Sequence, residues 1–143
     1  MIAAGGAPMN PTLSASSARA ARSARAVQSQ ALGARGEALA AAYLAEHGYE
    51  ILERNWRGRR GELDLIVRTA HTLVAVEVKT RRGTGYGTPL SAVTPQKVAR
   101  LRLLLGEWLS GSGEVSARLR IDVIGILLRA DAGPRLEHLR GVA

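Results

Sequence analysis

With 143 residues, of which 46% are hydrophobic and 22% charged, the chain has the length and composition of one globular domain with a single core. The absence of cysteine excludes a disulfide framework, a thiol nucleophile and a thiolate metal site, and no apolar stretch is long enough to span a bilayer, so we expect a cytoplasmic protein with no membrane partner. The net charge of +8, from 20 Lys and Arg against 12 Asp and Glu, favours a polyanionic partner.

The N-terminal segment, residues 1–32, consists mainly of Ala, Ser, Gly and Arg, and no acidic residue precedes Glu37. Such low complexity predicts a disordered tail. Arginines recur every third residue from Arg19 to Arg25, so a transient helix there would carry a basic stripe, and an organelle-targeting peptide has a similar composition. We therefore predict that the folded domain comprises residues 33–143.

The sequence pattern of this domain predicts the element order α-β-β-β-α-β, followed by a short edge strand. The predicted elements are a helix over 37–47 ended by Gly48, strands over 49–56, 62–68 and 72–79, a helix from Thr94-Pro95 to the turn 111–113, and strands over 119–128 and 135–139. In the second helix the apolar residues Leu101, Leu104, Leu105 and Trp108 recur at a spacing that predicts one buried stripe. The glycine-rich stretch 80–91 is typical of a mobile loop. We expect an α/β fold in which helices flank a mixed sheet.

Alternating apolar residues in the two strands 62–68 and 72–79 fix the register of a predicted hairpin. The predicted cross-strand pairs are Leu63–Val78, Leu65–Val76, Val67–Val74, Asp64–Glu77 and Glu62–Lys79. In this register two carboxylates, Asp64 and Glu77, face each other, and Lys79 lies two residues further along on the same face.

Like charges directly opposite in a ladder destabilise it, so the acidic pair calls for either a shared proton or a divalent cation such as Mg²⁺. A lysine beside two carboxylates is the combination that hydrolysis of a phosphodiester uses. The alternative is that this face of the hairpin is solvent-exposed and that Glu62 and Lys79 form an ordinary surface ion pair. Both interpretations remain open at this point.

Four motifs resemble the YraN-like uncharacterised bacterial family. They are Gly36-Glu37, Gly-Glu-Leu-Asp-Leu-Ile at 61–66, Val-Glu-Val-Lys-Thr-Arg at 76–81 and the Gly-Tyr-Gly loop at 85–87. That family is similar to archaeal Holliday-junction resolvases and to the PD-(D/E)xK nucleases. The resemblance covers about residues 33–128, and it implies a restriction-endonuclease-like core.

The resemblance also implies roles for single residues. Asp64 and Glu77 would bind Mg²⁺ or Mn²⁺ with the help of the Val78 carbonyl, and Lys79 would orient or activate the attacking water. Glu37 would complete the catalytic set from the first helix, although a solvated helix carboxylate is the alternative.

Other residues are expected to bind DNA, the partner that the resemblance implies. The arginines expected to hold the DNA backbone are Arg57, Arg59, Arg60, Arg81 and Arg82, and the helical residues Gln96 and Lys97 are expected to point towards the site. The resolvases further imply a homodimer that cuts branched or structured DNA in recombination or repair. A nucleic-acid-binding module without turnover is the alternative. Asp122 is expected to serve the structure of its strand, and the three histidines lack metal-ligand spacing.

Overall fold

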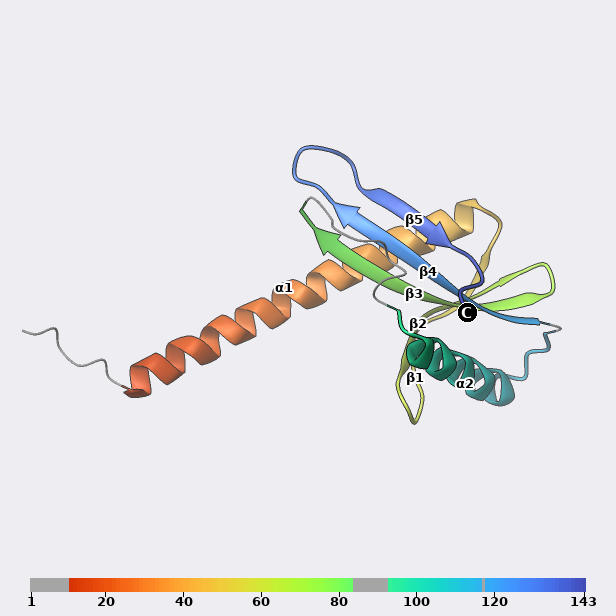
Figure 1. Ribbon diagram of the computed structural model, residues 1–143, viewed down its shortest axis with the longest axis horizontal. Helices are drawn as coiled ribbons and strands as arrows, with labels where there is room; N and C mark the ends of the chain where they lie inside the picture. The colour runs from red at the N-terminus through yellow and green to blue at the C-terminus, as the bar shows by residue number, and fades with distance from the viewer. Residues whose placement is uncertain (1–10, 84–92, 117) are drawn as a thin grey trace, which may run out of the picture. The chain divides into compact units, whose positions relative to one another are not determined.

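Figure 1 shows the computed structural model, which describes residues 11–83, 93–116 and 118–143. Its elements are helix α1 (Pro11–Glu46), strands β1 (Glu50–Arg57), β2 (Glu62–Thr69) and β3 (Thr72–Arg82), helix α2 (Pro95–Ser112), and strands β4 (Arg118–Leu128) and β5 (Arg135–Leu139). The predicted order is confirmed. β3 continues beyond the predicted Lys79 to Arg82, and most of the predicted mobile loop, with its Gly-Tyr-Gly sequence, lies outside the described residues. None of the described helices is long and apolar enough to cross a membrane.

The chain divides into two compact units, residues 1–32 and 33–143. Of the first unit the structure describes residues 11–32, which belong to α1. This segment is helical in the structure, because alanine and arginine are strong helix formers and Pro11 lies in the first turn, where proline is well accommodated. All side chains from Ala15 to Ala31 are exposed, so propensity rather than packing maintains this part of the helix.

The second unit is built on a five-stranded sheet in the order β1-β2-β3-β4-β5. β3 and β4 run parallel and are connected through α2, whereas all other neighbouring strands are antiparallel. Ala75 of β3 belongs to the core beneath α2. Thr80 lies an odd number of positions further along the strand, so its side chain is on the other face, where it meets α1 at Gly36. Helices therefore cover both faces, and the predicted α/β fold with a mixed sheet is confirmed.

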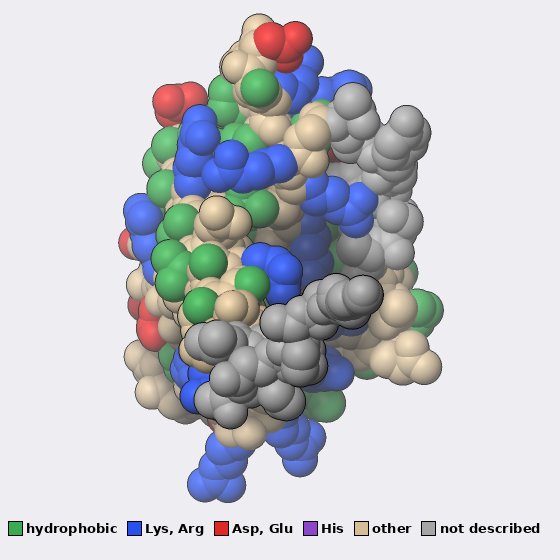
Figure 2. Space-filling view, turned by 90° about the vertical axis from the view of Figure 1, so that its left-hand side faces the viewer, with side chains coloured by type: hydrophobic (Ala, Val, Ile, Leu, Met, Phe, Trp, Pro, Cys, Tyr) green, Lys and Arg blue, Asp and Glu red, His purple; other side chains and the backbone are tan. Residues whose placement is uncertain are grey.

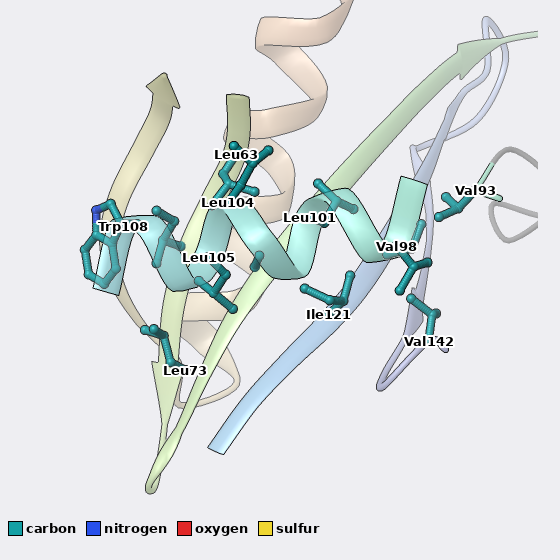
Figure 3. Close-up of a cluster of buried hydrophobic side chains, with 13 residues drawn as sticks. Leu63, Leu73, Val93, Val98, Leu101, Leu104, Leu105, Trp108, Ile121 and Val142 are labelled. Carbon is teal, nitrogen blue, oxygen red and sulfur yellow. The ribbon is translucent and has the colours of Figure 1, made fainter. Parts of the chain in front are cut away.

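The main core lies between α2 and the sheet (Figure 3). The predicted stripe of α2 is confirmed, since its four apolar residues are all buried. Thr94 caps the helix as predicted, and its Oγ1 accepts a hydrogen bond from Lys97 N at 3.1 Å. The C-terminal end differs from the prediction: the helix includes Gly111 and Ser112 and ends at Gly113, whose φ of 76° is readily adopted only by a residue without Cβ.

Candidate active site

The β2–β3 hairpin carries the predicted acids, and its ladder follows the predicted register only in part. Backbone pairing extends from the turn to Leu65–Val76 as expected and stops there. One step further, Asp64 Oδ2 accepts a hydrogen bond from the Val78 amide at 2.8 Å. The carboxylate thus takes the acceptor role of a β2 carbonyl, and three predicted backbone pairs are replaced. They are Leu63–Val78, Asp64–Glu77 and Glu62–Lys79, and Glu62 keeps its pairing with Arg57 of β1 on the other edge of β2.

The side chains of Asp64 and Glu77 nevertheless meet, as predicted. Glu77 is buried, with 8% of its surface exposed. Burial raises the pKa of Asp64 to about 8, and a hydrogen bond with Glu77 and the charge of that residue act in the same direction. The Val78 amide, which favours the ionised form, lowers the pKa without compensating for these effects. The Asp64 carboxyl group therefore holds its proton at neutral pH in the metal-free protein.

Glu37 of α1 lies close to this pair. Burial raises its pKa, a hydrogen bond from Asn55 lowers it, and the charges of Glu62 and Glu77 raise it further. The preceding Gly36 allows the approach of α1, since a Cβ atom there would lie 1.7 Å from Thr80 Oγ1. The Gly36-Glu37 motif thus combines a close helix–sheet contact with delivery of a third acid.

Asn55 is a residue of this site that sequence reasoning missed. It lies on β1 between Arg54, which pairs with Leu65, and Trp56, which pairs with Leu63, and so it faces Asp64. Its φ of 51° is left-handed, a conformation that asparagine tolerates better than most residues. Only this left-handed backbone on a predicted strand reveals the role, and periodicity does not.

Lys97 comes into the site from the first turn of α2. Its Nζ lies 3.2 Å from Glu77 Oε2, so one of the two helical residues expected at the site is brought there. Gln96, the other of the two, is exposed. Lys79 lies on the same face of β3 as Glu77, is half-buried and makes no ion pair with a described residue.

The donor set at the acidic pair suits a hard divalent cation. The Val78 carbonyl is directed to the same side as its amide, towards Asp64, because both groups of a strand residue face one neighbour. Glu77 Oε2 is buried and, although Lys97 Nζ is near, no hydrogen bond of good geometry reaches it from any described residue. In that same part of the chain no three His, Cys, Asp or Glu side chains group tightly enough to hold a metal alone. Mg²⁺ or Mn²⁺, which use few carboxylates plus waters, fit this set.

The five arginines expected to bind DNA are all exposed. Arg57 forms a solvent-exposed ion pair with Glu62 at 3.5 Å. Arg59 and Arg60 line an open cavity of about 650 Å³ against the outer side of α2, and the Arg59 amide donates to Glu107 at 3.2 Å. Figure 2 shows Lys and Arg side chains at several places on one face, with acidic side chains mainly at its margins. The face that this view shows is therefore mainly basic.

A second polar cluster lies on the α1 face of the sheet. Fully buried Asp122 accepts hydrogen bonds from Arg120, His138 and the Gly141 amide at 2.8–2.9 Å, and Tyr43 of α1 bonds to His138 at 3.0 Å. Burial opposes ionisation of Asp122, but these hydrogen bonds outweigh it and lower the pKa. Asp122 thus has the structural position that was expected. Its partner His138 was not anticipated, and an acid within an apolar strand was the available signal.

The chain is similar to one family profile and to many relatives of that family. The profile described as uncharacterised protein family UPF0102 matches residues 36–126. The UPF0102 protein of Rhodococcus jostii is 56% identical over 110 residues, which are 77% of this chain and 93% of that protein. The UPF0102 protein of Leifsonia xyli is 51% identical over 111 residues, 78% of this chain and 94% of the relative. The UPF0102 protein of Nocardia farcinica is 50% identical over 119 residues, with coverages of 83% and 94%.

Proposed function

This chain belongs to the uncharacterised protein family UPF0102, as the YraN-like resemblance predicted, and we propose that it is a metal-dependent endonuclease that acts on DNA. The observation that carries the proposal is the contact between the carboxyl groups of Asp64 and Glu77 beside the Val78 main chain. A buried acid beside a second acid suits a divalent cation, and the net charge of +8 suits a polyanionic substrate. The resemblance to resolvases supports branched or structured DNA of recombination or repair as the substrate, and a homodimer as the form that cuts two strands.

Each residue has a distinct task in the proposed reaction. Asp64, Glu77 and the Val78 carbonyl hold Mg²⁺ or Mn²⁺, which when bound lowers the pKa of a coordinated water and neutralises charge on the phosphate. Lys79 extends from the same face as Glu77 and orients the attacking water or the scissile phosphate. Glu37, whose raised pKa reflects burial near the other acids, completes the polar lining.

Exposed arginines of two chain segments supply affinity for the DNA backbone. Arg57, Arg59 and Arg60 belong to β1 and the turn after it, and Arg81 and Arg82 belong to the end of β3. Contacts to phosphates position a duplex without reading its sequence, so base composition should matter little and salt should weaken binding strongly.

A binding module without turnover is the second candidate. The observation in its favour is that the described residues contain no group of three acidic, histidine or cysteine ligands. Against it stands the acidic pair itself, because carboxylates beside a phosphate repel it unless a cation intervenes.

Cleavage of a panel of branched and linear DNA, with and without Mg²⁺ or Mn²⁺, tests the proposal. We expect the protein to cut a branched substrate only with the metal. Asp64→Asn and Glu77→Gln should abolish both Mn²⁺ binding and cleavage while DNA binding survives. Lys79→Ala should retain Mn²⁺ and reduce cleavage by roughly 10²- to 10⁴-fold, the range of a lost proton-transfer or water-orienting group.

Matched controls are the exposed acids Asp131 and Glu46, neutralised as Asp131→Asn and Glu46→Gln. Both variants should bind Mn²⁺ and cut DNA like the wild type. Wild-type Mn²⁺ affinity in both site variants would refute the metal site. Metal binding and DNA binding without cleavage of any substrate would favour the binding module.

A further inference from the structure

Lys97 stands in a position that does not suit a lysine on helix grounds. Thr94 is the N-cap of α2, so Lys97 occupies the third helical position, where its amide is bound by the cap. The positive end of the helix dipole disfavours a cation there, and Glu or Gln is the residue preferred at this position. The first turn of α2 contains no acid that would compensate. The preferences of the helix therefore do not explain the lysine at position 97, and the explanation lies in a contact outside α2.

The composition of the chain points to the same conclusion. Of its 20 basic residues only two, Lys79 and Lys97, are lysines, and both lie at the acidic pair. Arginine binds a carboxylate through a rigid two-pronged fork, whereas lysine is a compact charge on a flexible stem. A chain that uses arginine everywhere else uses at this site the cation that is easier to displace.

The contact with Glu77 is close but not locked. Lys97 Nζ is 3.2 Å from Oε2, yet this oxygen lacks a hydrogen bond of good geometry within the described chain. The side chain of Glu77 is 9% exposed and that of Lys97 is 35% exposed, so the ammonium reaches the buried carboxylate from the solvent side. The backbone from which it reaches is rigid, because Val93 and Val98 pack in the core with Val142 and Ile121 (Figure 3).

We propose that Lys97 is an internal counter-ion that neutralises Glu77 in the metal-free protein and is displaced from it when a divalent cation binds. The inference rests on the proposed function, since it concerns the same carboxylate. An unpaired buried carboxylate is costly, and the ammonium removes this cost while the site is empty. When the cation arrives, the flexible stem lets the ammonium leave towards solvent, where the phosphate backbone of a substrate would approach. Lys97 thus sets the affinity of the site by competing with the metal.

The test is calorimetric titration of the full-length protein with Mn²⁺, with Lys97→Gln, Lys97→Arg and Arg102→Gln beside the wild type. Gln keeps the helix propensity of lysine and suits this position of the first turn, so the fold should be retained. Arg102 is an exposed base of α2 outside the site, and its loss reports the general effect of one charge. We expect Lys97→Gln to bind Mn²⁺ roughly tenfold more tightly than Arg102→Gln, because a unit charge within a few ångströms has been removed.

Lys97→Arg distinguishes displacement from mere proximity of charge. A guanidinium holds the carboxylate more firmly, so this variant should bind Mn²⁺ more weakly than the wild type although the net charge is unchanged. The melting temperatures should follow the same order as the affinities. Addition of Mn²⁺ should raise the melting temperature of Lys97→Gln more than that of the wild type, and the melting temperature of Lys97→Arg less.

The outcomes separate the counter-ion role of Lys97 from the metal site itself. If the wild type binds Mn²⁺ and Lys97→Gln binds it no more tightly than Arg102→Gln, the metal site stands and the counter-ion role is refuted. If none of the four proteins binds Mn²⁺, the metal site of the proposed function fails and the exchange fails with it.

Discussion

The carboxyl group of Asp64 links the protonation of the site to the stability of the fold. Burial and the neighbouring Glu77 raise its pKa from the ordinary 3.8 to about 8. Between these two pH values the folded protein holds a proton that the unfolded chain releases, so unfolding becomes easier as pH rises.

The first prediction follows from the upward direction of this pKa shift. In a metal chelator, the melting temperature of the wild type should fall as pH rises from about 4 through about 8, because stabilisation present below the unfolded pKa is lost through the folded pKa. Asp64→Asn should lack this component and be the more stable protein at alkaline pH. Calorimetric scans across the range check it, with Asp131→Asn as the control that keeps the wild-type slope. Identical pH profiles for wild type and Asp64→Asn would contradict the prediction.

At the scale of the elements, the packing of α1 on the sheet depends on a close contact at Gly36. At Gly36 the helix approaches Thr80 so closely that a Cβ atom would lie 1.7 Å from Oγ1 and 2.8 Å from Cβ of that residue. Gly33, three residues earlier on the same helix, has open space around its Cα. The same substitution at these two positions should therefore have opposite effects.

The second prediction uses this pair. Gly36→Ala should destabilise the protein by about 1–3 kcal/mol, the cost of overpacking, and should weaken Mn²⁺ binding because Glu37 shifts with the helix. Gly33→Ala should stabilise it by about 0.5–1 kcal/mol, since glycine costs entropy within a helix. Urea unfolding measures both. Adding Thr80→Ala to Gly36→Ala should recover part of the loss, and an unaltered loss would show that Thr80 is not the obstacle.

The element order and most of the hairpin register were predictable because they depend on local signals. Alternating apolar residues position Leu65 opposite Val76, and Thr94-Pro95 marks the start of α2. The register fails at Asp64, since a side chain that replaces a backbone acceptor leaves no trace in periodicity.

The remaining features of the site depend on tertiary approach, which the spacing of residues does not encode. Lys97 of α2 lies beside Glu77 of β3, and the left-handed backbone of Asn55 turns its side chain towards the acids. His138 meets Asp122 only because β5 returns beside β4. The hairpin register supplied Asp64 and Glu77, the resemblance supplied Glu37 and the helical lysine, and the structure was needed for their partners.

At the scale of the whole molecule, the two units contribute differently to stability and to binding. Residues 1–32 contain three arginines and no acid, and the exposed side chains of the described part bury little apolar surface. The second unit contains the sheet, the core and the site.

The third prediction concerns removal of the first unit. A chain that lacks residues 1–32 should melt within a degree or so of the full chain, because segments that bury little surface add little stability. Its affinity for duplex DNA should depend less on salt, with the slope reduced by up to about 0.9 for each arginine that contacts a phosphate. Full-length protein with Arg19, Arg22 and Arg25 replaced by glutamine is the control for charge alone. A large loss of melting temperature would show that the boundary is misplaced.

The parallel ladder between β3 and β4 joins segments that are synthesised far apart in time. Every β3 residue pairs with one 46 positions later, as Thr72 does with Arg118, so the hairpin with both site acids leaves the ribosome before α2 and β4 exist. In that interval β3 is an open edge, the kind of strand that recruits another nascent chain. A second copy that paired with it would bring Glu77 near its own counterpart, and like charges across a ladder oppose pairing. A charged Glu77 on this open edge is therefore expected to disfavour pairing with a second chain until β4 covers the strand.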